Sequence, residues 1–163
     1  MAAPHLLHPV SETHIEERKG LDKLGFKEDV FRQVSNSLDN NQTASEIDSL
    51  LLEASNNLSE MAEKIGGERK EIIRFLLKLA YEEYDLSFSE NKIVNLAEYQ
   101  DAWGFIKVAS YHAKNISDQK VAKVVDREIK KLRKYWIKGP LPVETPVKPS
   151  TIKNAIESVL KQL

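Results

Sequence analysis

Apolar residues recur at intervals of three and four along most of the chain, which is the spacing of one face of an α-helix. Residues 26–38 show this pattern, and residues 47–65 continue it up to the pair Gly66-Gly67, which predicts the end of a helix. Two later segments, 68–86 and 90–114, carry apolar residues around more than one face. We therefore expect these two helices to lie centrally, the second capped by Ser89.

The pattern predicts an all-α fold, a compact helical bundle of about five main helices over residues 11–138. Residues 1–10 contain two prolines and no period, so we interpret them as an irregular arm. Four prolines in residues 140–150 predict an extended linker over residues 139–149. A short amphipathic helix over residues 150–163 completes the chain. It has to dock on this bundle or on a neighbour, because an isolated helix of this length is marginal in water.

The net charge of −1 conceals an uneven distribution of charge along the 163 residues. Residues 114–138 hold nine basic and three acidic residues, whereas residues 1–113 hold 12 basic and 20 acidic ones. Such asymmetry indicates an interaction surface rather than a fold.

The basic residues fall on one face of a predicted helix over residues 118–138, with Ser117 or Asp118 as its cap. Val121, Val125, Ile129, Leu132 and Trp136 share one line of this helix and should pack on the bundle. The opposite line, called the basic stripe below, consists of Lys120, Lys123, Arg127, Lys130, Lys131, Lys134 and Lys138. Acidic residues lie to its sides, so we expect these like charges to be mutual neighbours.

A nucleic-acid backbone is a partner that would offset this repulsion, and we predict the basic stripe as its contact. Tyr135, at the margin of the stripe, is a further candidate contact, whereas Trp136 is better explained as a core residue. A solvated helix face is the plain alternative, and an acidic protein surface, including that of another copy of the chain, would also fit.

Residues that could support catalysis or metal binding do not form a known motif. The sequence contains no cysteine, which excludes thiolate chemistry and favours a reducing, cytoplasmic setting. A di-iron bundle needs Glu-x-x-His pairs, but Ala109 stands three residues before His112. Glu82, Glu83 and Asp85 are interpreted as a solvated acidic helix end. We therefore predict a non-enzymatic protein without cofactor or metal. No segment has the roughly 20 apolar residues of a membrane span, so we expect no membrane partner.

A resemblance to a known family rests on three features: a cysteine-free bundle of this size, the basic ending "KKLRKYWIKG" and the closing helix "KPSTIKNAIESVL". Together they resemble the small helical subunit of CRISPR effector complexes of the Cascade type. The resemblance implies a non-catalytic subunit that lines a channel for RNA or DNA in an antiviral ribonucleoprotein.

Two functions are therefore consistent with the sequence. The first is an RNA-binding or otherwise nucleic-acid-binding subunit of a larger assembly, with other protein subunits as neighbours. The alternative is a protein-interaction scaffold that self-associates through its acidic and basic faces.

Overall fold

The computed structural model describes the backbone of residues 15–163 and the side chains from Lys19 onward. The predicted arm, residues 1–10, lies outside the described residues. Within them the chain forms seven helices and one two-stranded hairpin, which confirms the all-α prediction. Backbone contacts divide the chain into two compact units, residues 1–66 and residues 67–163.

The described part of the first unit contains three helices, α2 (Ile15–Leu24), α3 (Glu28–Asp39) and α4 (Asp48–Ile65). Its small core contains Phe26, Val30, Phe31, Val34, Ile47, Ala54 and Met61. The buried amide of Asn57 on α4 holds the turn between α2 and α3. Its Oδ1 accepts from the backbone N–H of Lys27 at 2.9 Å, and its Nδ2 donates to the carbonyl of Gly25 at 2.8 Å. One buried side chain thus satisfies two backbone groups of this turn.

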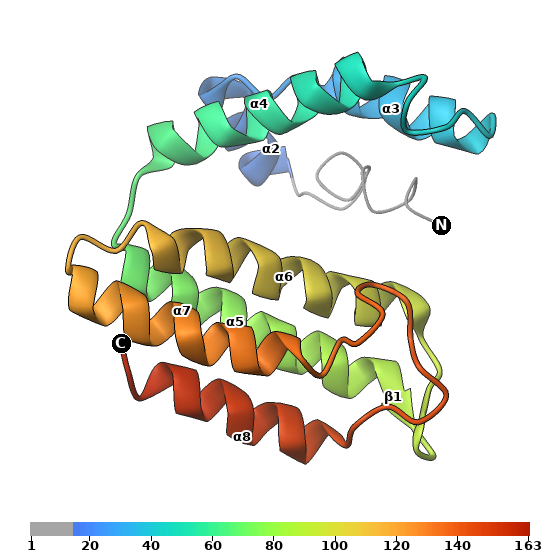
Figure 1. Ribbon diagram of the computed structural model, residues 1–163. Helices are drawn as coiled ribbons and strands as arrows, with labels where there is room; N and C mark the ends of the chain where they lie inside the picture. The colour runs from blue at the N-terminus through green and yellow to red at the C-terminus, as the bar shows by residue number, and fades with distance from the viewer. Residues whose placement is uncertain (1–14) are drawn as a thin grey trace. The chain divides into compact units, whose positions relative to one another are not determined.

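The second unit is a four-helix bundle. Its helices are α5 (Arg69–Ser87), α6 (Leu96–Lys114), α7 (Gln119–Arg133) and α8 (Pro149–Leu160). Each helix runs opposite to the next, and α8 returns along α5, so the four helices enclose one core (Figure 1). The C-terminal helix predicted to dock is therefore the fourth helix of this bundle, where Ile152, Ile156 and Val159 are buried.

Helical periodicity placed the bundle core correctly in α7. On the predicted packing line Val125, Ile129 and Leu132 are buried in α7 and Trp136 is buried just beyond it, whereas Val121 is half-buried. They pack in the same core as Ile73, Leu77 and Ile106 from α5 and α6. At one end of the bundle the core is aromatic. Trp136 lies edge-on to Tyr84, with ring centroids 5.1 Å apart, and 5.8 Å from Tyr99. The interior of the bundle is thus aliphatic along its length and aromatic where α7 ends.

Two local expectations differ from the structure. Ser89 does not cap a helix: Phe88–Ser89 and Lys92–Ile93 form a hairpin, and α6 begins at Leu96 with Asn95 as its N-cap. The hairpin turn needs two residues with positive φ, which Glu90 and Asn91 supply at 50° and 60°.

The sequence also predicts one bundle over residues 11–138, whereas the structure has two units. They part at Gly66 and Gly67, whose φ angles of 64° and 113° favour glycine.

Candidate functional site

The basic stripe occupies the outer face of α7 and the turn that follows it. All seven of its basic side chains are exposed, as the helical pattern predicts. Asp118 is the N-cap of the helix, and its Oδ1 accepts from the backbone N–H groups of Lys120 and Val121. The helix ends earlier than predicted, at Arg133, and tight turns carry the chain on to Trp136. Tyr135 is half-buried and packs against the bundle core.

The stripe is partly neutralised by carboxylates of the same helix. Asp126 pairs with Lys130 at 2.7 Å, and Glu128 accepts from Arg127 at 3.1 Å and from Lys131 at 2.8 Å. These carboxylates lie beside the stripe within reach of the long basic side chains. Arg127, Lys130 and Lys131 are therefore relieved of part of the expected repulsion, whereas Lys123 and Lys134 have no ion-pair partner among the described residues. The pKa of the Glu128 carboxyl is lowered, first of all by its hydrogen bond from Lys131.

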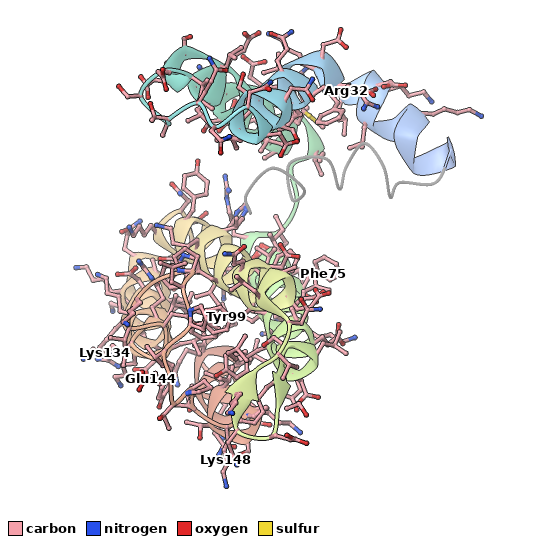
Figure 2. All side chains as sticks on the ribbon, turned by 90° about the vertical axis from the view of Figure 1, so that its right-hand side faces the viewer. Arg32, Phe75, Tyr99, Lys134, Glu144 and Lys148 are labelled. Atoms are coloured by element: carbon pink, nitrogen blue, oxygen red, sulfur yellow. The ribbon has the colours of Figure 1, made fainter. Side chains whose placement is uncertain are left out.

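At the end of α7 the stripe meets an open pocket of about 350 Å³. The pocket is lined by Trp103, Lys130, Arg133, Lys134, Trp136 and Ile137. Figure 2 shows Lys134 at the outer edge of the bundle, whereas Tyr99 points into its interior. The rings of Trp103 and Trp136 are stacked with centroids 6.3 Å apart, so the aromatic end of the core forms one side of the pocket.

Gly139 shapes the chain beside this pocket. The glycine has a φ of 63°, and its N–H donates to the carbonyl of Trp136 at 3.0 Å, which closes a turn between α7 and the proline-rich linker. A Cβ at this position would lie 4.0 Å from the Trp103 ring, so space would allow a side chain but the left-handed backbone disfavours it. The turn keeps Trp136 and Ile137 at the pocket.

Two cations, Arg133 of the pocket and Lys107 on α6, lie over the ring of Trp103. The guanidinium Cζ of Arg133 lies 5.2 Å from the centre of the Trp103 ring, and the Lys107 ammonium lies 6.0 Å from the same ring. Both fall within or close to the range of cation–π attraction. Arg133 Nε and Trp136 Nε1 are buried hydrogen-bond donors that have no acceptor among the described residues. The pocket thus combines positive charge with donors that the fold leaves unpaired.

Sequence reasoning missed this pocket because its parts are distant in the chain. Trp103 and Arg133 lie on different helices, and no short motif joins them. A helix wheel places Arg133 off the line of the stripe, and the packing of α6 on α7 brings it to the indole of Trp103. The two tryptophans of the sequence were the available signal: Trp136 is buried, as interpreted, whereas Trp103 is only half-buried.

A second group of charges lies where α5 faces α6. Burial, and then the neighbouring carboxylates of Glu98, Asp101 and Glu82, raise the pKa of Glu83 to about 7. Glu83, part of the acidic helix end interpreted as solvated, is thus half-buried. His112 is buried, and its Nδ1 lies 2.9 Å from Nη1 of Arg69. Burial and the Arg69 charge lower the pKa of this imidazole.

Neither a metal-binding cluster nor a membrane-spanning helix is present among the described residues. No group of three or more histidine, aspartate or glutamate side chains among residues that the structure describes is arranged to hold a metal ion. None of the helices in that part of the chain is both long enough and apolar enough to cross a membrane.

Comparison with protein families identifies the bundle. Residues 64–163 match the iron permease-associated four-helix bundle domain, and this span agrees closely with the second unit, residues 67–163. Neither a curated protein nor a solved structure matches the chain. The family description names association with a permease, which agrees with the prediction of a protein partner at that coarse level.

The family match overturns the resemblance to a CRISPR subunit and, with it, the nucleic-acid-binding, RNA-binding and antiviral interpretations, which are wrong. The physical reason lies in the features that suggested them. A cysteine-free bundle and a basic amphipathic helix are common to many helical proteins, and the closing helix is simply the fourth helix of this bundle. By its match over residues 64–163, the chain belongs to the family of the iron permease-associated four-helix bundle domain.

Proposed function

We propose that this chain is a non-catalytic accessory protein that binds an iron permease through the four-helix bundle of residues 67–163. The observation that carries the proposal is the family match, which spans all four helices α5–α8. The proposal also includes a cytoplasmic location, which rests on the cysteine-free composition.

The distribution of charge between the two units supports a binding role for the bundle. Residues 67–163 hold 18 basic and 13 acidic residues, whereas residues 1–66 hold 6 basic and 12 acidic ones. A net positive bundle is attracted to an acidic surface of a partner and repelled by a basic one. Exposed apolar side chains near the end of α7, Ile137 and Leu141, add contact area of the kind that interfaces bury.

Co-purification tests the proposal directly. The full chain is mixed with a detergent-solubilised iron permease of the same organism and separated by size exclusion at several salt concentrations. We expect a stoichiometric complex that weakens as salt rises, because charge supports the contact. An unrelated transporter in the same detergent is the control. Elution of the chain apart from the permease at every salt concentration would overturn the proposal.

A further inference from the structure

The pocket at the end of α7 has the composition of a binding site for an anion. Of the residues that line it, three are cationic (Lys130, Arg133 and Lys134) and none is acidic. Lys130 is shared with Asp126, but neither Arg133 nor Lys134 has a carboxylate partner among the described residues. The carbonyl end of α7 carries about half a negative charge, which offsets part of the positive charge of these three side chains. Their combined charge is larger, so the pocket stays positive.

The hydrogen-bond donors of the pocket point to a ligand more specifically than its charge does. Trp136 is only 3% exposed, and its indole Nε1 has no acceptor in the part of the chain that the structure describes. The same holds for Nε of Arg133, whose guanidinium is fixed over Trp103. A buried donor without an acceptor is costly, and most such donors in proteins are paired. These donors are closed to water, so a ligand oxygen would reach them only on a shift of the side chains that cover them, and it would then give them the acceptor that the fold does not provide.

The apolar surroundings favour a peptide over a simple ion. Ile137 lines the pocket and is 78% exposed, and Leu141 follows after the turn at 52%. An inorganic anion would leave these side chains in water, whereas an apolar residue of a bound peptide would cover them. A volume of about 350 Å³ is at the small end of ligand sites and suits one or two side chains.

We propose that this pocket binds the carboxylate of an acidic peptide segment in a protein partner, with an aliphatic residue of that segment covering Ile137. The carboxylate pairs with the Arg133 guanidinium, accepts from the Trp136 indole once the side chains over that N–H shift, and is attracted by the Lys134 charge at the rim. The inference deepens the proposed function and rests on it only for the identity of the partner, which would be an acidic, partly apolar segment of the permease.

Peptide titration followed by NMR tests the pocket by itself. Trp103 and Trp136 are the two tryptophans of the sequence, so their indole N–H signals can be assigned with a Trp103→Phe variant. The probe is the acetylated tetrapeptide amide Leu-Asp-Glu-Leu, and its controls are the Leu-Asn-Gln-Leu peptide and inorganic phosphate at equal ionic strength. We expect a saturable shift of the Trp136 indole signal with the acidic peptide and none with the amide peptide.

Two lysines of α7 provide a matched pair of variants. Lys134 lines the pocket and Lys123 does not, yet both are exposed and neither has an ion-pair partner among the described residues. We expect Lys134→Gln to weaken peptide binding about threefold to fivefold and Lys123→Gln to leave it unchanged. Arg133→Lys keeps the charge but removes Nε–H and the planar guanidinium, and should weaken binding about tenfold. Unchanged melting temperatures would show that the variants are folded.

The experiments distinguish failure of the proposed peptide site from failure of the proposed binding to the permease. Equal shifts with both peptides, no shift, tighter binding of phosphate than of the acidic peptide, or equal losses in the two lysine variants would each overturn the peptide site. If Lys134→Gln weakens peptide binding as expected while its affinity for the permease equals that of the wild type, the permease docks elsewhere and the inference about its segment is wrong. If the peptide binds and the permease does not co-purify, the pocket stands and the proposed function fails.

Discussion

The phenol of Tyr84 donates a hydrogen bond to the backbone carbonyl of Val147 at 2.8 Å, joining α5 to the proline-rich linker across 63 residues of sequence. Burial raises the pKa of Tyr84 above its ordinary value of 10, which already leaves the hydroxyl protonated and able to donate at physiological pH. The bond fixes the path by which the linker leads from the end of α7 to α8, so we expect it to contribute to closure of the bundle.

Replacing Tyr84 by Phe removes this hydrogen bond while keeping the ring that packs on Trp136. We expect Tyr84→Phe to lower the free energy of unfolding by about 1 kcal/mol, the usual net value of such a bond. Tyr111→Phe is the matched control, because this exposed tyrosine also loses only a hydroxyl. Urea unfolding followed by circular dichroism gives both values, and equal effects of the two substitutions would contradict the role assigned to Tyr84.

The docking of α8 is tested by two isoleucines in different surroundings. Ile152 is fully buried in the bundle core, whereas Ile137 is largely exposed. We expect Ile152→Ala to cost about 2–5 kcal/mol through lost burial and the cavity that remains. Ile137→Ala should change the free energy of unfolding by no more than about 0.5 kcal/mol. If Ile152→Ala melts at the temperature of the wild type, α8 does not pack as described.

The stability of the bundle should change with pH because the Glu83 carboxyl titrates. Its pKa in the folded bundle is about 7, above the ordinary value of 4.5. The folded state therefore holds this proton more tightly than the unfolded chain does, and stability is lost as pH rises from about 4.5 to about 7. Replacing Glu83 by Gln removes the titrating group. At pH 8 we expect Glu83→Gln to be more stable than the wild type by about 1 kcal/mol, after reduction for solvent screening.

Thermal melts at pH 5 and pH 8 check this prediction for Glu83. The gain should shrink toward zero at pH 5, where the wild-type carboxyl is already protonated in the folded bundle. Glu157→Gln on the exposed face of α8 is the control and should show no such difference. A gain of equal size at both pH values would mean that the substitution acts through packing and not through the proton.

In the first unit, Asn57 should be the most sensitive polar residue of α4. Asn57→Ala leaves the N–H of Lys27 and the carbonyl of Gly25 without their partner, and we expect a loss of about 2 kcal/mol. Asn56→Ala, on the exposed face one residue earlier, is the control, because both changes improve helix propensity equally. Hydrogen exchange of α3 and α4 measures the effect, and similar protection in the two variants would argue against the role of Asn57.

The parts of the fold that follow from local periodicity could be predicted from the sequence. The line through Val125, Ile129 and Leu132 identified the buried face of α7, and Asp118 was one of two predicted caps. The hairpin at Glu90 and Asn91 could not be predicted from the sequence, because strands of two residues leave no alternation of apolar and polar residues to detect.

The candidate site was predictable only in part, since sequence shows charge but not its partners. The basic residues of α7 are exposed as expected, yet their pairing with Asp126 and Glu128 depends on side-chain reach. The contact between Arg133 and Trp103 depends on how two helices pack, and neither residue carries a signal of the other. The charge pattern therefore predicted correctly that these side chains are exposed, whereas the nucleic-acid partner assigned to them was wrong.

The antiparallel return of α8 along α5 has a consequence for synthesis on the ribosome. Arg74 Nη1 donates to the carbonyl of Leu160 at 3.5 Å, so the bundle closes between its first helix and its last. The growing chain presents α5, α6 and α7 before α8 exists, with the apolar surface that receives Ile152 and Val159 still open to water. The nascent three-helix stage of the bundle is therefore open to aggregation until α8 emerges and packs.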